Sequence, residues 1–191
     1  MWTSFLLTSL RIPPAPDLSC TDVDYKGLVY GTQLAIHFMR RNPTPGGNII
    51  CTVSVASIYP HESYPEYDGA KAAVLNWIFA TGRILKAKEN ISISGVLPGI
   101  VATNIIPPEM VAAVSPECLT PVSTIVGGYQ KALDDPSLAG QAIEASSVDT
   151  YVQVKKPEYL NGRYSQRATT VWEPLFKSYH GEKSGLPDAI V

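Results

Sequence analysis

Two predicted strands with one long helical pattern between them constrain the fold of this chain most strongly. The first run, Ile49–Val55, is rich in β-branched residues and alternates little between apolar and polar side chains, which is typical of a strand covered on both faces. A second strand is predicted at Ile91–Leu97, and a helical pattern that ends near Lys88 lies between the two. Because neighbouring parallel strands need a long crossover connection, usually a helix, this spacing predicts two strands of a parallel sheet.

Further segments extend the alternation of helices and strands. We predict a helix over Thr21–Arg41, a helix over Pro121–Asp134 and a strand near Gln141–Ala145. The residues of the first helix that we expect to face the core are Leu28, Val29, Thr32, Ala35, Ile36 and Met39. This order of elements is typical of a parallel sheet with helices on both faces. The expected fold class is α/β, a partial doubly wound (Rossmann-like) parallel sheet.

The length predicts a single domain over residues 1–191, with an irregular segment over 1–20, a core over 21–150 and a tail over 151–191. The formal net charge of −2 and the 17% of charged residues argue against nucleic acid or an anionic membrane as a partner. The opening Met1–Leu10 is apolar, but it is too short to span a membrane and lacks the features of a signal peptide.

Cysteine and histidine usage bears on the compartment and on metals. Three cysteines, Cys20, Cys51 and Cys118, are an odd number without paired spacing, which indicates free thiols in a reducing compartment such as the cytoplasm. The histidines have no metal-ligand spacing, so we predict no metal site. These histidines are His37, His61 and His180.

Tyr67 and Lys71 lie one turn apart near the start of the central helix. Ser63 and Glu66 have the spacing of a capping box, which places the helix start just before Tyr67. The apolar or small residues of the helix recur with a helical period at Ala70, Ala73, Val74, Trp77, Ile78, Thr81 and Leu85. At a helix N-terminus, the macrodipole and the ammonium of Lys71 would both favour a phenolate at Tyr67. The pair is therefore a candidate proton-transfer site.

The chain contains two further Tyr-x-x-x-Lys pairs, and both are weaker candidates. Tyr151 and Lys155 bracket an alternating segment that reads as extended, where residues four apart lie roughly 13 Å from one another. Tyr179 and Lys183 enclose Gly181 in a polar tail. Only the pair on the central helix has a helical context.

The residues around this pair resemble the short-chain dehydrogenase/reductase family. The resemblance covers roughly residues 16–150. It rests on the segments Asp22–Gly27, Ser54, Tyr67–Lys71 and Pro98–Thr103. The tail, with Trp172–Phe176 and Gly185–Asp188, is similar to fungal relatives of 15-hydroxyprostaglandin dehydrogenase, many of which serve secondary metabolism.

The resemblance implies a role for each matching residue. Tyr67 would be the general acid/base that exchanges a proton with the substrate oxygen, and Ser54 would hydrogen-bond that oxygen. Lys71 would lower the pKa of Tyr67 and hold the nicotinamide ribose of NAD or NADP, and Tyr67 would bind the cofactor as well. Val101 and Thr103 would approach the nicotinamide carboxamide. The loop over residues 104–120 would contact the substrate, and its apolar residues Ile105, Ile106, Met110 and Val114 suggest an apolar small molecule.

The sequence also departs from the family pattern. The family places a glycine-rich turn after its first strand to hold the dinucleotide, whereas Gly127 and Gly128 of this chain lie inside a predicted helix. The resemblance begins after the fourth strand of the family fold, which implies an N-terminally truncated member without the adenosine-binding half. Asp24 stands where the family usually has an asparagine, and we interpret it as a helix-capping carboxylate paired with Thr21.

The truncation has a consequence for partners. The strand at Ile49–Val55 would lie at a sheet edge, and an exposed apolar edge invites pairing with another chain. We therefore expect a homodimer or a partner subunit, or refolded N-terminal residues, to cover this edge. The usual dimer contact of the family uses helices that correspond to residues 22–41 and 65–88.

Three functions remain open from the sequence. The first is an NAD(P)-dependent oxidoreductase that acts on a secondary alcohol or ketone. The second is a redox-neutral isomerase, cyclase or dehydratase that uses the same Tyr67 and Ser54, since acid/base chemistry needs no hydride carrier. The third is non-catalytic: a truncated pseudoenzyme, a subunit that completes a partner, or a truncated gene product in which the motif is retained but unused.

Overall fold

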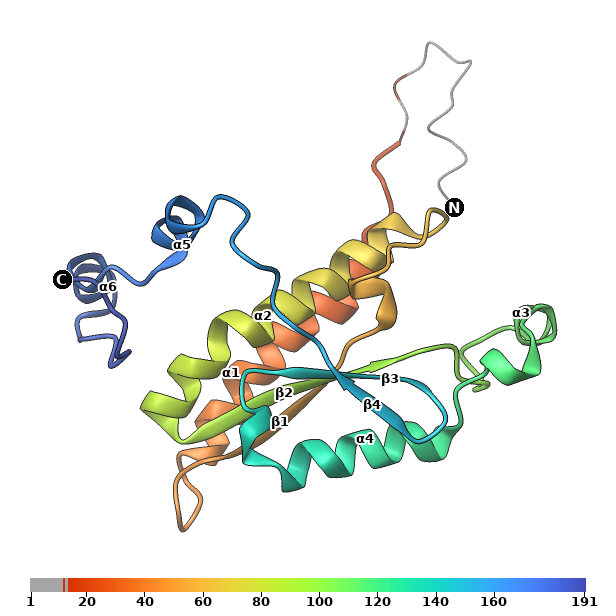
Figure 1. The fold of residues 1–191 in the computed structure, drawn as a ribbon, viewed down its shortest axis with the longest axis horizontal. Helices are drawn as coiled ribbons and strands as arrows, with labels where there is room; N and C mark the ends of the chain where they lie inside the picture. The colour runs from red at the N-terminus through yellow and green to blue at the C-terminus, as the bar shows by residue number, and fades with distance from the viewer. Residues whose placement is uncertain (1–11, 13) are drawn as a thin grey trace.

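A four-stranded sheet runs through the centre of the computed structural model, which describes residues 12 and 14–191 (Figure 1). The opening Met1–Leu10 lies outside the described residues. The sheet has the order β1-β2-β3-β4. Its strands are β1 (Gly47–Thr52), β2 (Ile91–Pro98), β3 (Ala142–Ser147) and β4 (Thr150–Gln153). The first three are parallel, and β4 is antiparallel to β3. The predicted α/β fold with a partial doubly wound sheet is thus confirmed, with one antiparallel strand added.

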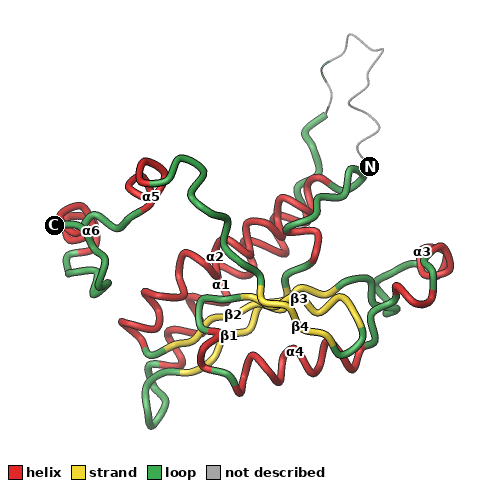
Figure 2. Tube along the Cα trace, in the orientation of Figure 1, coloured by secondary structure: helices red, strands yellow, loops and turns green. Residues whose placement is uncertain are grey.

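Helices cover both faces of the sheet (Figure 2). A π-helical turn, Thr21–Lys26, continues directly into α1 (Gly27–Met39). This helix and α2 (Pro65–Glu89) lie on one face, and α4 (Val122–Asp134) lies on the other (Figure 1). No helix within residues 12 and 14–191 combines the length and the apolar character needed to cross a bilayer.

Two apolar clusters follow from this layering. The cluster between β1, β2 and the α1/α2 layer contains Ile78, Ile91 and Ile93, which are fully buried. Four of the six residues expected to face the core from α1 do so: Thr32 is buried, and Leu28, Ile36 and Met39 pack against this cluster. Val29 and Ala35 are only half-buried. A smaller cluster between the sheet and α4 comprises Val96, Leu138, Ile143 and Ala145. The β-branched strands therefore contribute to both layers.

Gly82 marks the closest approach of α2 to the sheet layer. A Cβ at this position would lie 2.2 Å from the Cα of Gly140, in the turn before β3. Gly140 itself has a φ of +71°, a conformation that favours glycine. The two glycines therefore allow the second half of α2 to pack closely against the turn that precedes β3.

Both predicted capping boxes are wrong. Tyr64 precedes α2 without a capping side chain. The Glu66 carboxylate instead accepts from the backbone N–H and the hydroxyl of Thr21, at 2.7 and 2.6 Å. Because these donors lie within reach on the neighbouring helix, Glu66 joins the two helices rather than closing its own first turn.

Two element boundaries also differ from expectation. The strand predicted over Ile49–Val55 ends at Thr52, after which the chain forms a 3-10 turn at Val55–Ser57. The stretch between β2 and α4, expected to be irregular, contains the short helix α3 (Pro108–Ala113) and a 3-10 turn at Pro116–Cys118.

The tail forms an arm with two helices, α5 (Arg163–Thr169) and α6 (Glu173–His180), which extends from the sheet body (Figure 1). Ion pairs tie the arm to the second half of α2: Arg83 contacts Asp188, and Lys88 contacts Glu182.

Candidate active site

Ser54 and the Tyr67/Lys71 pair come from two elements at the carboxyl end of β1. Ser54 follows the strand in extended conformation, is 8% exposed, and its hydroxyl oxygen accepts the N–H of Ala56 at 3.1 Å. Tyr67 and Lys71 lie in the first turns of α2, with Tyr67 half-buried and Lys71 buried. Within the described residues, no hydrogen bond joins the Ser54 and Tyr67 side chains. A ligand oxygen would be needed to connect the two hydroxyls.

The Lys71 ammonium is the best-defined group of the site. Its Nζ donates to Asp24 Oδ1 at 3.0 Å and to the backbone carbonyl oxygen of Thr52 at 3.2 Å. It also lies 5.7 Å from the centroid of the Tyr67 ring, within the range of a cation–π contact. Because an ammonium has three N–H donors, the two acceptors leave one donor for a ligand or for Tyr67.

Asp24 corrects a sequence-based interpretation. We expected a helix-capping carboxylate, but Asp24 lies within the π-helical turn and pairs with Lys71 across the two helices. A buried ammonium is costly unless it is paired and hydrogen-bonded, so Lys71 needs such a partner. Because the two residues are 47 positions apart, local spacing could not predict this contact. The one sequence signal was that Asp24 stands where the short-chain dehydrogenase/reductase family usually has an asparagine.

Thiols near the site remain protonated at neutral pH. Cys51, in β1, is buried, and this burial raises the pKa of its thiol to about 12. The hydrogen bond to Glu66, with burial as the next cause, raises the pKa of the Cys20 thiol. Neither thiol is therefore activated as a nucleophile, and the chemistry of this edge rests on hydroxyl groups and the ammonium.

The two residues expected at the nicotinamide carboxamide follow β2. Because β1 and β2 are parallel, the loop that carries Val101 and Thr103 leaves the same edge of the sheet as Ser54. Val101 is half-buried and Thr103 is exposed. The base of the loop is held where the Thr120 N–H donates to the Ile100 carbonyl at 2.8 Å.

The expected substrate loop over residues 104–120 extends outward and carries α3 near its tip (Figure 1). Ile105 is 86% exposed and Met110 is 40% exposed, whereas Ile106 and Val114 are half-buried. The loop thus offers apolar side chains at the edge that carries Ser54.

Asp68 is a site neighbour that sequence reasoning missed. It is 6% exposed, and its Oδ2 accepts the backbone N–H of His61 at 2.5 Å, while Oδ1 has no hydrogen-bond partner among residues 12 and 14–191. The contact holds the segment between Ser54 and α2 against the helix, directly beside Tyr67. The same segment lines a groove of about 580 Å³ with Asp68 at one side.

Comparison with known proteins finds a similar family and relatives of similar sequence. A family model described as short chain dehydrogenase matches residues 17–110. The short-chain dehydrogenase/reductase prx6 of Penicillium rubens is 57% identical over 181 residues, which cover 94% of this chain and 60% of prx6. The relative prx7 of the same organism is 35% identical over 96 residues, 49% of this chain and 34% of prx7. The chain thus spans less than two thirds of the length of these curated relatives.

Solved structures support the fold. The 3-hydroxyacyl-CoA dehydrogenase type-2 of Mycobacterium avium superposes with a TM-score of 0.58 at 18% identity, covering 73% of this chain and 57% of that one. The 3-oxoacyl-[acyl-carrier protein] reductase of Brucella melitensis, solved in complex with NAD, gives a TM-score of 0.55 at 25% identity, covering 66% of this chain and 54% of the reductase.

Proposed function

We propose that the chain is a member of the short-chain dehydrogenase family and contributes the proton-transfer site of an NAD(P)-dependent oxidoreductase acting on a secondary alcohol or ketone; the family-model match over residues 17–110 and the 57% identity to prx6 support this. The observation that carries this proposal is the buried Lys71 ammonium beside the Tyr67 ring, at the sheet edge that also carries Ser54. The Lys71 ammonium thus lies beside the ring of the residue that we propose as the acid/base, near the N-terminus of α2.

Three residues would act on the substrate oxygen. In the oxidising direction, the Tyr67 phenolate would take the proton of the substrate hydroxyl. Ser54 would donate a hydrogen bond to the same oxygen as it becomes a carbonyl, and Lys71 would stabilise the phenolate. In the reducing direction the Tyr67 phenol would return the proton. Positioned acid/base groups of this kind contribute roughly 10²–10⁴-fold to a rate.

The residues at this edge fit the nicotinamide end of a dinucleotide. The third N–H donor of Lys71, left by Asp24 and Thr52, would bind a ribose hydroxyl. Val101 and Thr103 would hold the carboxamide. When bound, NAD or NADP supplies the hydride exchange with the substrate carbon. The NAD complex of the Brucella melitensis reductase supports this assignment of the cofactor.

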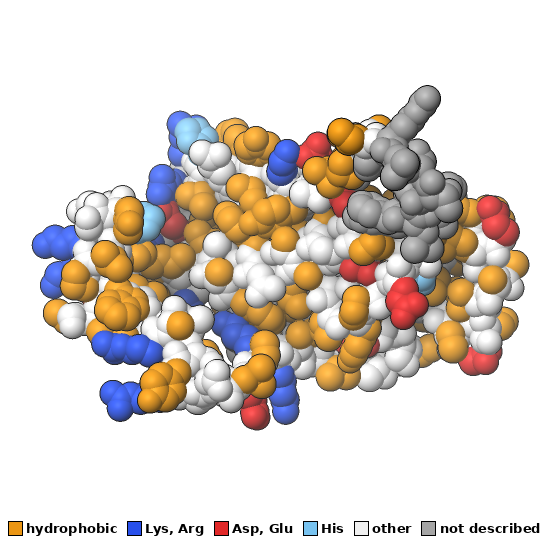
Figure 3. Space-filling model, turned by 90° about the horizontal axis from the view of Figure 1, so that it is seen from above, with side chains coloured by type: hydrophobic (Ala, Val, Ile, Leu, Met, Phe, Trp, Pro, Cys, Tyr) orange, Lys and Arg blue, Asp and Glu red, His pale blue; other side chains and the backbone are white. Residues whose placement is uncertain are grey.

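Two exposed apolar surfaces support proposals on the class of substrate and on the oligomeric state. The apolar residues of the loop over residues 104–120 support an apolar small molecule, as expected for a fungal relative of 15-hydroxyprostaglandin dehydrogenase in secondary metabolism. On the face that carries α1 and α2, apolar side chains form several exposed groups (Figure 3). Tyr30, Leu34 and Phe38 recur every four residues along α1 and are 58–65% exposed. This stripe supports a homodimer through α1 and α2.

Direct titration with NADH and NADPH, followed by nicotinamide fluorescence, tests the proposal. We expect saturable binding that Lys71→Ala weakens about tenfold, the effect of losing one charged hydrogen bond. Tyr179→Phe, at an exposed tyrosine of α6, is the control and should leave the affinity for the dinucleotide unchanged. Absence of binding at millimolar concentrations of both nucleotides would contradict the assignment of the cofactor. Turnover that persists after all nucleotide is stripped would favour the redox-neutral alternative.

A further inference from the structure

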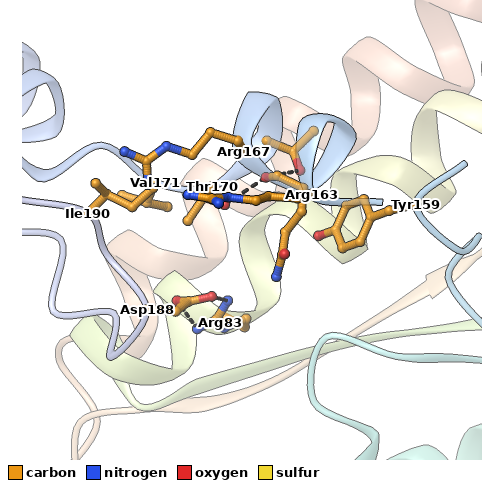
Figure 4. Close-up of a pocket in the computed structure, with 10 residues that line it drawn as sticks. Arg83, Tyr159, Arg163, Arg167, Thr170, Val171, Asp188 and Ile190 are labelled. Atoms are coloured by element: carbon orange, nitrogen blue, oxygen red, sulfur yellow. Dashed lines mark hydrogen bonds and ion pairs between the residues drawn. The ribbon is translucent and has the colours of Figure 1, made fainter. Parts of the chain in front are cut away.

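A second concentration of polar groups lies at the far end of α2, away from Tyr67. It surrounds a cavity of about 320 Å³ between α2, α5 and the C-terminal segment (Figure 4). Polar side chains from several parts of the chain line this cavity. They are Arg83 of α2, Tyr159 of the segment before α5, Arg163, Gln166 and Arg167 of α5, and Asp188 of the C-terminal segment. Lys71 and Arg83 are twelve positions apart, about 18 Å along a helix, so this cavity is separate from the proposed catalytic site.

One side of the cavity is a neutral pair. Arg83 donates to both carboxylate oxygens of Asp188, from Nη1 at 3.0 Å and from Nη2 at 2.5 Å. This hydrogen bonding raises the pKa of Arg83 and lowers the pKa of Asp188, so both stay charged at neutral pH. The bidentate geometry holds Arg83 and Asp188 in place on this side of the cavity, and their two charges cancel.

The opposite side carries positive charge without a counter-ion. Arg163 and Arg167 have no acidic partner among the described residues, so three guanidiniums face one carboxylate around the cavity. The Arg167 guanidinium lies 5.0 Å from the Trp172 ring centroid, a contact that orients its planar group without neutralising it. Figure 4 shows Arg163 across the cavity from the Arg83–Asp188 pair.

The donors around the cavity match an oxyanion. A guanidinium presents a rigid fork of N–H donors that pairs bidentately with a carboxylate or phosphate group. Tyr159 and Gln166 add a hydroxyl and an amide that can donate to the same ligand. The volume is at the lower end of the range for small-molecule sites. Isolated surface arginines are usually solvated, but here guanidinium, hydroxyl and amide donors converge on one concave space beside a fixed ion pair.

We propose that this cavity binds a small oxyanion, the phosphate or carboxylate group of a metabolite, with Arg163 as its principal ligand and Arg167 at its rim. The site is independent of the proposed oxidoreductase chemistry.

Calorimetric titration of the full chain with inorganic phosphate, and separately with citrate, tests the proposal and distinguishes the two oxyanion classes. We expect saturable binding of at least one anion, with an affinity that falls as chloride raises the ionic strength. Arg163→Gln should weaken that affinity about tenfold or more. Arg163→Lys, which keeps the charge but loses the fork, should fall between wild type and Arg163→Gln.

Lys177→Gln is the matched control, since it removes one exposed positive charge from the same arm without touching the cavity. It should bind the anion like wild type. Circular dichroism spectra that coincide for all variants would show that the arm has not unfolded. The proposal is overturned if neither anion binds saturably, or if Arg163→Gln and Lys177→Gln change the affinity equally.

Discussion

Asp24 holds the ammonium of Lys71, with 3.0 Å between Oδ1 and Nζ. The cation beside Tyr67 is therefore supported by an anion from the preceding helix. The Lys71 side chain is 10% exposed and that of Asp24 is 25% exposed, so the pair is largely shielded from water. This contact and the other features described above lead to four predictions.

Removing Asp24 should destabilise the fold. Asp24→Ala leaves the buried ammonium of Lys71 without its carboxylate, and we expect a loss of about 1–3 kcal/mol in the free energy of unfolding, measured by urea denaturation. Asp24→Asn keeps an acceptor oxygen and should cost less. Asp22→Ala is the control, because Asp22 and Lys26 form an exposed pair; its effect should stay below about 0.5 kcal/mol. Equal losses for Asp22→Ala and Asp24→Ala would mean that the pair does not stabilise the protein.

Removing the Tyr67 hydroxyl should abolish proton transfer without disturbing the fold. Tyr67→Phe is expected to lower kcat by roughly 10²–10⁴-fold once a substrate is in hand, while the thermal midpoint stays near that of wild type. Tyr179→Phe, at an exposed tyrosine of α6, serves as the control and should retain full activity. A Tyr67→Phe protein with undiminished turnover would exclude both acid/base functions.

Filling the contact between Gly82 and Gly140 should disrupt the packing of α2. The added methyl of Gly82→Ala would meet the backbone of Gly140 at 2.2 Å, and overpacking of this kind costs about 1–3 kcal/mol. Gly31→Ala, inside α1 with open space around it, should instead stabilise by up to about 1 kcal/mol. Thermal or urea unfolding of the two variants measures whether each substitution lowers or raises the free energy of unfolding. If Gly82→Ala left the free energy of unfolding unchanged, the contact between α2 and Gly140 would be able to relax around the added methyl, and the prediction would be wrong.

Burial of Cys51 should be visible in its reactivity and in alkaline stability. With its pKa raised from 9.0 to about 12, the thiol stays protonated in the folded state while the unfolded chain ionises above about pH 9. Its contribution to stability is therefore complete below pH 9 and is lost as the pH rises toward 12. At pH 8 a thiol reagent should modify the exposed Cys118 well before Cys51. Mass mapping of the labelled peptides would contradict this if Cys51 reacted first.

Periodicity was enough to predict most of the secondary structure. The helices α1, α2 and α4 and the strands β1, β2 and β3 were all expected, because apolar residues recur with helical or extended periods in those segments. The helix starts at Thr21 and just before Tyr67 were predicted correctly, but the capping boxes were wrong because a capping box is inferred from local spacing alone. Glu66 matches that spacing, yet its carboxylate binds Thr21, 45 positions away.

The sequence by itself determined an α/β fold and one helical face shared by Tyr67 and Lys71, since both depend on spacing within a segment. Only the tertiary structure decided which faces meet. The pairing of Asp24 with Lys71, the close approach of Gly82 to Gly140, and the convergence of Arg83 and Arg163 on one cavity join residues far apart in the chain. Local periodicity carries no information on such distances, because they follow from how the packed helices and the sheet bury their apolar faces together.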